Sequence, residues 1–468
     1  MRNPELWNKL RQFEFDAPSD VYGFTLRLAK ENAWTMGFTQ RAIDEYRKFI
    51  YLAIVSDSMV SPSSIVDEVW HLHLIYTRSY ADMCTLVGKQ IQHVPATHNP
   101  DEGKIFADAR DKASSLYREE FGEQPEDIWK GRTMYDLLDF PKAKMKLRSF
   151  IIIAMIVLGI IAAPMYFAVY PLYIQINPAN FLVGYTMICF VVFLFLQFYN
   201  NYRHEDSINL HSMESFINQL TAGELTYLKY NKVEAVIYSY INHLVAHDFI
   251  TVDSRRRLNA SPDQVPTAPE EVQIMQYLTA KGPMTCGNLA QAMSSRAIFS
   301  NVKTSMDGFK KYMHKSKAHH SLFRVNFYVL ALLFLLGVER IATGVMRDKP
   351  VLYISILCGI LLVVSIVFLY RLNQMFTSRV IPAYFALRLK NEHTMMADWR
   401  WKFFLLGAAC FVPAFALIAD GSITDRWNFL NTDGRSSSGN SSCGSSCGSS
   451  CGGGGGCGGG GCGGCGGG

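Results

Sequence analysis

Four of the chain's 12 histidines fall between residues 71 and 98, and an aspartate lies just upstream of them. Imidazole and carboxylate groups are ligands of zinc and similar cations, and histidine-rich stretches are associated with metal binding. On a helix, Asp67 and His71 share one face because they are four residues apart, so they could bind an ion together or pair with each other. His93 or His98 could fold back from downstream to complete the site. We therefore predict a site for a divalent metal such as zinc, with the candidate ligands Asp67, His71, His73 and His93.

Three of these residues also fit purely structural roles. On a regular helix, His71 and His73 point about 200° apart, so they cannot bind one ion unless the helix breaks locally. His73 also belongs to an apolar stripe that includes Trp70, which is typical of a hydrogen-bonded core histidine. Asp67 and His71 could form a structural pair. A cysteine–histidine nucleophile is disfavoured, because Cys84 would lie about 16 Å along the helix from His73.

The helix that carries the motif has clear end signals. Ser61 is a capping residue followed by Pro62 in the first turn, and Gly88 offers a stop. We therefore predict one helix over Ile65–Val87. An earlier helix, with apolar residues at helical spacing, is predicted to begin at the cap Thr39.

Long apolar runs indicate a membrane protein. Charged residues make up 18% of the chain and hydrophobic residues 49%. Between Arg148 and Arg203 no residue is charged, and one helix of that length would measure about 81 Å, far more than the roughly 30 Å of a bilayer core. A helical hairpin is therefore expected. The predicted spans are Phe150–Leu172, Phe181–Tyr199, Val325–Val338 with an extension to Val345, Val351–Tyr370, and a short fifth candidate, Phe403–Ala419.

Basic residues near the span ends predict sidedness. Lys142, Lys144, Lys146 and Arg148 precede the first span, which places the amino-terminal domain in the cytoplasm. The amino terminus also lacks the pattern of a secretory signal. The loop with Arg347 and Lys349 disagrees with this arrangement, and Glu339 and Arg340 interrupt the third span; near its end, they could pair with each other. If all five segments cross, the carboxyl-terminal tail is external.

Between the second and third spans the sequence becomes polar again. A short helix from Leu220, a longer helix over Val233–His247, a strand at Phe249–Val252 and a basic turn at Arg255–Arg257 follow the order of a winged helix. A second unit over Pro269–His314 repeats the helices. Val233–His247 has no Lys or Arg to contact phosphates or bases. Nucleic acid is therefore disfavoured as a partner, and a protein-interaction module is preferred.

The carboxyl-terminal residues are rich in glycine and cysteine. Ser-Ser-Cys-Gly occurs three times in succession, and six of the 11 cysteines lie after residue 434. This stretch has no apolar residue except its cysteines, so we expect a disordered tail. Its thiols leave three roles open: a passive spacer, soft-metal or redox chemistry, and covalent modification or cross-linking.

Two family resemblances follow from these motifs. The stretch from Ser61 through the Val-Asp-x-x-Trp-His-x-His helix to Pro95 resembles the amino-terminal domain of the glycine-rich domain proteins, over roughly residues 20–140. That resemblance implies a domain without implying a catalytic mechanism. Residues 200–468 resemble a family of bacterial membrane proteins that carry a central module between spans and glycine-cysteine-rich ends, although Lys229-Tyr230-Asn231 departs from the glycine pair usual there.

We therefore predict a mainly α protein of the bacterial inner membrane. Its predicted parts are a helical cytoplasmic domain (1–147), a transmembrane hairpin (148–202), a cytoplasmic tandem winged-helix-like module (203–323), a transmembrane pair (324–371), a cytoplasmic connector (372–402), a candidate fifth span (403–419) and a disordered tail (434–468).

The preferred function is a membrane-anchored scaffold or sensor that binds an unidentified protein partner and is linked to a metal. The competing class is an enzyme with a metal or acid–base centre around Asp67 and His71. An enzyme requires a concave site around these residues, whereas a scaffold would bury His73 and leave Asp67 and His71 exposed. A transporter is disfavoured, because the spans contain almost no ionisable residues.

Overall fold

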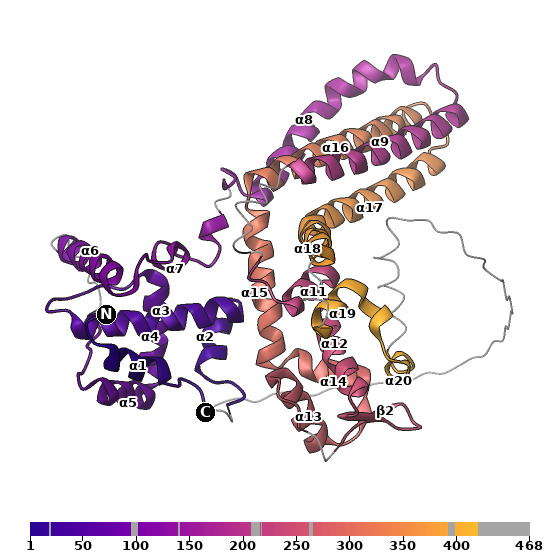
Figure 1. Cartoon of the computed structure of the whole chain (residues 1–468). Coiled ribbons are helices and arrows are strands. Elements are labelled where there is room, and N and C mark those ends of the chain that lie inside the picture. The colour runs from indigo at the N-terminus through magenta and orange to yellow at the C-terminus, as the bar shows by residue number, and fades with distance from the viewer. Residues whose placement is uncertain are drawn as a thin grey trace, which may run out of the picture.

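The computed structural model describes residues 1–17, 20–94, 102–138, 141–206, 216, 218–261, 265–391 and 398–419. Figure 1 shows three parts within these residues: an amino-terminal helical domain, a bundle of long helices, and a helical module with a small sheet. The mainly helical class predicted from the sequence is confirmed. The Cys/Gly-rich tail lies outside the described residues, so the expectation of disorder stays a prediction.

The amino-terminal domain is built around one fully buried helix face. The apolar residues Tyr46, Phe49 and Ile50 of α3 are at most 1% exposed and form the centre of the core. This helix begins at Met36 rather than after the predicted cap Thr39, because the hydroxyl of Thr35 accepts the Phe38 amide hydrogen at 3.2 Å. The domain comprises α1 (Pro4–Gln12), α2 (Phe24–Asn32), α3 (Met36–Val55), α4 (Ser64–Ile75), α5 (Thr77–Val87), α6 (Glu102–Phe121), α7 (Glu126–Trp129) and the 3-10 turn η1 (Asp136–Leu138).

The single helix predicted over Ile65–Val87 is wrong, because the structure has two helices there, and the predicted cap Ser61 is also wrong. The backbone leaves the helical region at Tyr76, with ψ of 62°, and divides the segment into α4 and α5. The cap is Ser63, whose hydroxyl accepts the Val66 amide hydrogen, and not Ser61. The predicted stop at Gly88 is confirmed, because its φ of 73° suits glycine and ends α5.

Within the described residues, four helices are long and apolar enough to cross a membrane, which indicates a membrane protein. They include both arms of the predicted hairpin. The third of them, α16, packs against the other three, and in its buried part Asn326 exchanges two amide hydrogen bonds with Asn200 of α9, at 2.7 and 2.9 Å. The four helices are α8 (Leu147–Tyr173), α9 (Pro178–Asp206), α16 (Lys317–Val345) and α17 (Leu352–Met375).

The charged pair that interrupts the third predicted span is accommodated inside α16. Arg340 donates to the carbonyl oxygens of Tyr173 and Ile176, near the end of α8, and its guanidinium lies over the ring of Phe181. Arg340 therefore satisfies carbonyl groups at the end of a neighbouring helix. This bonding explains how α16 continues through Arg340 to Val345.

The middle module contains the predicted order of helix, helix and hairpin. Its sheet is antiparallel, in the order β1-β2-β3, with Ile250 opposite Ala260 and Leu258 opposite Met284. Because β3 belongs to the second predicted unit, the two units share one sheet. The winged-helix assignment itself stays a prediction. The elements are α11 (Ala222–Tyr230), α12 (Val233–Ala246), β1 (Ile250–Val252), β2 (Arg257–Ala260), α13 (Pro269–Lys281), β3 (Met284–Thr285), α14 (Cys286–Ser294) and α15 (Ala297–His314).

The candidate fifth span is wrong. After α17, the π-helical turn η2 (Phe376–Val380) and α18 (Ile381–Asn391), the chain forms the short pieces α19 (Trp399–Leu406), η4 (Gly407–Cys410) and α20 (Pro413–Ala416). A backbone φ of +58° at Gly407 interrupts the helix. These pieces are too short to cross a bilayer and pack on α11 and α12 instead (Figure 1).

Polar side chains of the module hold this carboxyl-terminal segment in place. Asn242 of α12 donates to the Cys410 carbonyl at 3.3 Å and accepts the Val412 amide hydrogen at 2.9 Å. Lys229 of α11 donates to the Phe404 carbonyl at 2.8 Å. The apolar character of residues 403–419 therefore reflects docking onto the module.

The amino-terminal domain also contacts the module. Helix α2 packs against α15, the Tyr135 hydroxyl donates to the Ser305 carbonyl at 2.8 Å, and the Asn301 side chain donates to the Trp34 carbonyl at 3.2 Å. The module therefore contacts both the amino-terminal domain and the carboxyl-terminal segment 399–419. Along the chain, α8 and α9 lie between the amino-terminal domain and the module, and α16 and α17 lie between the module and residues 399–419.

Candidate metal centre

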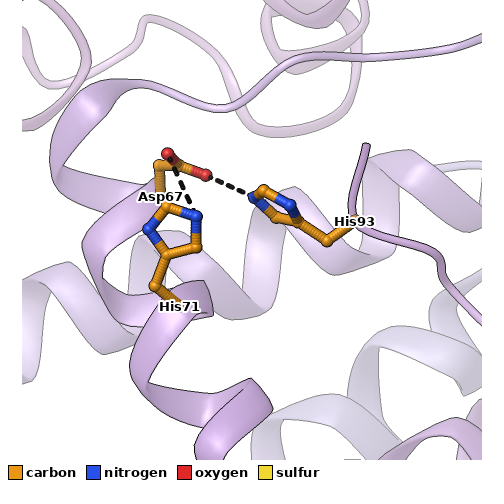
Figure 2. A group of neighbouring side chains, drawn as sticks. All are labelled: Asp67, His71 and His93. Atoms are coloured by element: carbon orange, nitrogen blue, oxygen red, sulfur yellow. Dashed lines mark hydrogen bonds and ion pairs between the residues drawn. The ribbon is translucent and has the colours of Figure 1, made fainter. Parts of the chain in front are cut away.

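Three of the four predicted ligands converge at one place on the amino-terminal domain. Figure 2 shows Asp67 and His71 on one helix with His93 facing them from a separate segment. The Nε2 atom of His93 lies 3.1 Å from Oδ1 of Asp67, and Nε2 of His71 lies 3.8 Å from Oδ2. One candidate ligand atom from each residue can be chosen so that all three lie within 4.8 Å of one another.

The two distances from Asp67 are close to the separations between neighbouring ligand atoms around a bound ion. Zinc bonds of about 2.0–2.1 Å in a tetrahedron place neighbouring ligand atoms about 3.3 Å apart. The two distances from Asp67, one from each carboxylate oxygen, lie on either side of that value. Side-chain rotations that shorten the remaining separations, which reach up to 4.8 Å, would bring the three ligands onto one ion. Two imidazoles and one carboxylate leave a coordination position for water or for a partner's side chain.

Helix α4 places the first two ligands by its regular geometry. Asp67 and His71 are one turn apart, and the helix is fixed at its start by the Ser63 cap. Asp67 lies in the first turn, where the helix dipole favours a negative charge. The side chain of Asp67 is 35% exposed and that of His71 51%, so an ion can reach them from solvent.

His93 is placed by two aromatic residues that sequence reasoning did not assign to the site. The Trp70 indole donates to the Tyr80 hydroxyl at 3.2 Å, and this hydroxyl donates to the Ile91 carbonyl. The His93 ring packs edge-on against Trp70, with 4.6 Å between ring centroids. Trp70 and Tyr80 therefore hold residues 91–93 beside α4. Trp70 stands in the Val-Asp-x-x-Trp-His-x-His motif, which was the available signal, but the sequence does not show that Trp70 bonds to Tyr80.

His73 does not join the group. It is fully buried, with Nδ1 at 3.0 Å from the Tyr46 hydroxyl and Nε2 at 3.0 Å from the Ser79 hydroxyl. Burial lowers the pKa of His73 to about 4, so the ring is neutral at physiological pH. This is the hydrogen-bonded core histidine that the apolar stripe indicated as the alternative. His98 lies outside the described residues.

Comparison with known proteins finds matches to the amino-terminal part of the chain. Residues 23–105 match the UCP032817-like family. A curated relative, glycine-rich domain-containing protein 1 of Arabidopsis thaliana, is 29% identical over 104 residues, which cover 21% of this chain and 12% of the relative. No solved structure matches the chain.

The matched residues contain the whole candidate metal centre. They support the resemblance of the amino-terminal domain to glycine-rich domain proteins, while the second resemblance, to bacterial membrane proteins, stays a prediction. The chain spans only about an eighth of the relative's length, since the aligned part is 12% of it. The relative's name refers to glycine content and gives no activity to transfer.

Proposed function

We propose that this protein is a membrane-anchored, metal-linked sensor or scaffold whose amino-terminal domain binds a divalent cation such as zinc through Asp67, His71 and His93. The observation that carries the proposal is the convergence of these three ligands within 4.8 Å. The open coordination position allows a partner protein to supply the remaining ligand, so metal loading would control partner binding.

The exposure pattern favours a sensor or scaffold over an enzyme. His73 is buried, whereas His71 is half exposed and Asp67 about one-third exposed. A hydrolytic metal centre would instead need a concave, water-excluding wall around its open position. The enzyme alternative retains one supporting feature, because a metal with two histidines and one carboxylate also leaves room to activate water.

We further propose that the amino-terminal domain, the middle module and residues 399–419 all face the cytoplasm of a bacterial cell. The basic residues before α8 support this orientation, as do the contacts among the three parts. With four crossings, the cysteine-rich tail lies on the same side, where thiols are kept reduced. Its thiols are then available as soft-metal ligands in the same compartment as the metal centre.

A competition titration tests the metal site. The chain without residues 434–468, whose six cysteines could bind zinc, is titrated with zinc in detergent micelles in the presence of a chromophoric chelator. The His71→Ala and Asp67→Asn variants of this chain are compared with the unsubstituted one. We expect each variant to bind zinc at least about 10–100-fold more weakly, the loss typical even of residues that only support a ligand. Glu68→Gln is the matched control, because this exposed neighbour of Asp67 is not one of the three converging residues. Equal affinity in wild type and the two site variants would overturn the proposal.

A further inference from the structure

A second feature of the molecule is a cavity of about 290 Å³ where the three polar parts meet. Helices α11, α12, α13 and α15 of the module form its walls, Met36 contributes from the amino-terminal domain, and Trp401 contributes from α19. Figure 1 shows α11, α12 and α19 next to one another beside α15. The cavity is well separated in the fold from the metal centre on α4 and is independent of the function proposed for that centre.

The walls of the cavity carry an excess of acidic groups. Glu224, Glu270 and Asp398 line it, and among the described lining residues Arg400 is the one basic side chain. Arg400 is already paired with Asp398 at 2.9 Å. Arg400 also attracts Glu270, so three acidic side chains share one cation, and Glu224 has no cation partner among the described lining residues.

Burial makes this excess of carboxyl groups costly in free energy when they are ionised. Glu224 is 3% exposed, and burial raises its pKa to about 7, although its carboxylate accepts the Thr221 amide hydrogen at 2.7 Å. Burial also raises the pKa of Glu270. A buried carboxylate without a counter-charge is stabilised by any cation that can enter beside it.

An unused acceptor lies in the same walls. Asn301 is 1% exposed, and its side-chain nitrogen donates to the Trp34 carbonyl at 3.2 Å. That bond fixes the orientation of the amide, which leaves Oδ1 without a hydrogen-bond partner among the described residues. Buried polar atoms in native proteins are nearly always hydrogen-bonded, so an unpaired acceptor in a cavity wall points to a donor that binds there.

Size and wall chemistry select the class of ligand. The acidic residues here do not form a group close enough to hold one metal ion, whereas such a group is present at Asp67 among the residues the structure describes. Much of the remaining lining is apolar, with Val236, Phe299 and Val302 among it. The volume is near the lower end of the range of about 300–1,000 Å³ found for small-molecule sites.

We propose that this cavity binds a small organic ammonium ion. The charged nitrogen lies toward Glu224, Glu270 and the Asn301 amide oxygen, and the hydrocarbon part lies on the apolar walls. Because residues from the amino-terminal domain, the module and α19 all line the cavity, the bound ammonium ion stabilises the contact among the three parts.

The test is isothermal titration calorimetry on the full chain in detergent micelles, with a metal chelator present so that the centre at Asp67 makes no contribution. The probes are n-butylammonium and its neutral counterpart n-butanol. We expect saturable binding of n-butylammonium to wild type and no saturable binding of n-butanol. Since Glu224 must be ionised, affinity should rise about tenfold between about pH 6 and pH 8.

Two variants and one control separate the site from general effects. Glu270→Gln removes one carboxylate and should weaken n-butylammonium binding at least about tenfold. Val302→Phe fills the cavity and should abolish binding without changing charge. Glu234→Gln is the control, because Glu234 is on α12 but does not line the cavity, and it should bind as wild type does.

Failure of n-butylammonium to bind wild type would overturn the proposal. Equal binding by Glu270→Gln and Val302→Phe, or equal binding of n-butanol, would also overturn it. None of these results affects the zinc titration, so the two proposals fail separately.

Discussion

Replacement of the buried histidine should remove a specific acid sensitivity of the amino-terminal domain. His73 is neutral in the folded protein, with a pKa of about 4, whereas an exposed histidine titrates near 6.5. Between these two values the unfolded state binds more protons than the folded state. The stability contributed by the neutral ring is therefore complete above about pH 6.5 and is lost progressively as the pH falls to about 4.

The size of the effect follows from the shift. A lowering from 6.5 to about 4 corresponds to about 3 kcal/mol, at about 1.4 kcal/mol for each pKa unit. At about pH 5 the domain should already have lost about 2 kcal/mol relative to neutral pH. His73→Gln keeps a donor and an acceptor for Tyr46 and Ser79 but cannot be protonated, so this part of the pH dependence should disappear.

The assay is hydrogen exchange with mass spectrometry on peptides from α3 and α4, in the full chain with a metal chelator present. Free energies of opening are compared at about pH 7.5 and pH 5 after correction for intrinsic exchange rates. His71→Gln is the matched control, because His71 is on the same helix but half exposed. Its loss of stability between the two pH values should equal that of wild type.

A pH-dependent loss that is the same in wild type and His73→Gln would refute this reasoning. It would mean that His73 is not the group that takes up the proton. A larger loss in His73→Gln would contradict the account more strongly, because it would require the charged ring to stabilise the fold.

Three further predictions follow from other contacts. Tyr80→Phe removes the hydroxyl that holds Ile91 beside α4, so zinc affinity in the competition titration should fall about 10–100-fold while the domain stays folded, as circular dichroism would show; unchanged affinity would mean that His93 needs no such support. Lys229→Met leaves carbonyls of α19 without their buried donor, at a cost of about 1–3 kcal/mol, so chymotrypsin should cleave residues 399–419 about tenfold faster than in wild type; equal cleavage rates would argue against docking by Lys229. A Lys349→Cys variant, in the loop between α16 and α17, should react with an impermeant maleimide in intact cells. An Arg255→Cys variant, in the β1–β2 turn, should react only after lysis. The opposite pattern would contradict the proposed orientation.

The features predictable from sequence were those set by local composition. Long apolar runs predicted the four long helices. A run that enters lipid must hydrogen-bond its own backbone groups, and a helix does so whatever the rest of the fold. The spacing of Asp67 and His71 predicted their shared face, since helix geometry alone determines it.

The errors arose where tertiary contacts decide between local alternatives. Several hydroxyl residues near the starts of α3 and α4 could serve as caps, and the structure uses Thr35 and Ser63. The break at Tyr76 has no glycine or proline to mark it; the Tyr76 ring instead packs on Phe24, 5.4 Å away between centroids, and under Arg27. The residues around Tyr76 in the sequence do not indicate a contact with residues about 50 positions away.

The same reason applies to the fifth apolar run and to His93. Residues 403–419 are apolar because they dock on the module, and a short apolar run that packs on protein has the composition of one that enters lipid. His93 lies 26 residues from Asp67 along the chain, and its position depends on the bond from Tyr80 to Ile91. The sequence supplied both ligands but not the contact that brings them together.

Elemental mass spectrometry on the purified protein tests the metal centre most directly. The chain is purified from cells without a histidine tag, and residues 434–468 are deleted so that the six tail cysteines cannot bind metal. The account predicts about one divalent metal ion, such as zinc, per chain, retained in Glu68→Gln and lost in His93→Ala. Metal-free wild-type protein, or metal that persists in His93→Ala, would contradict it.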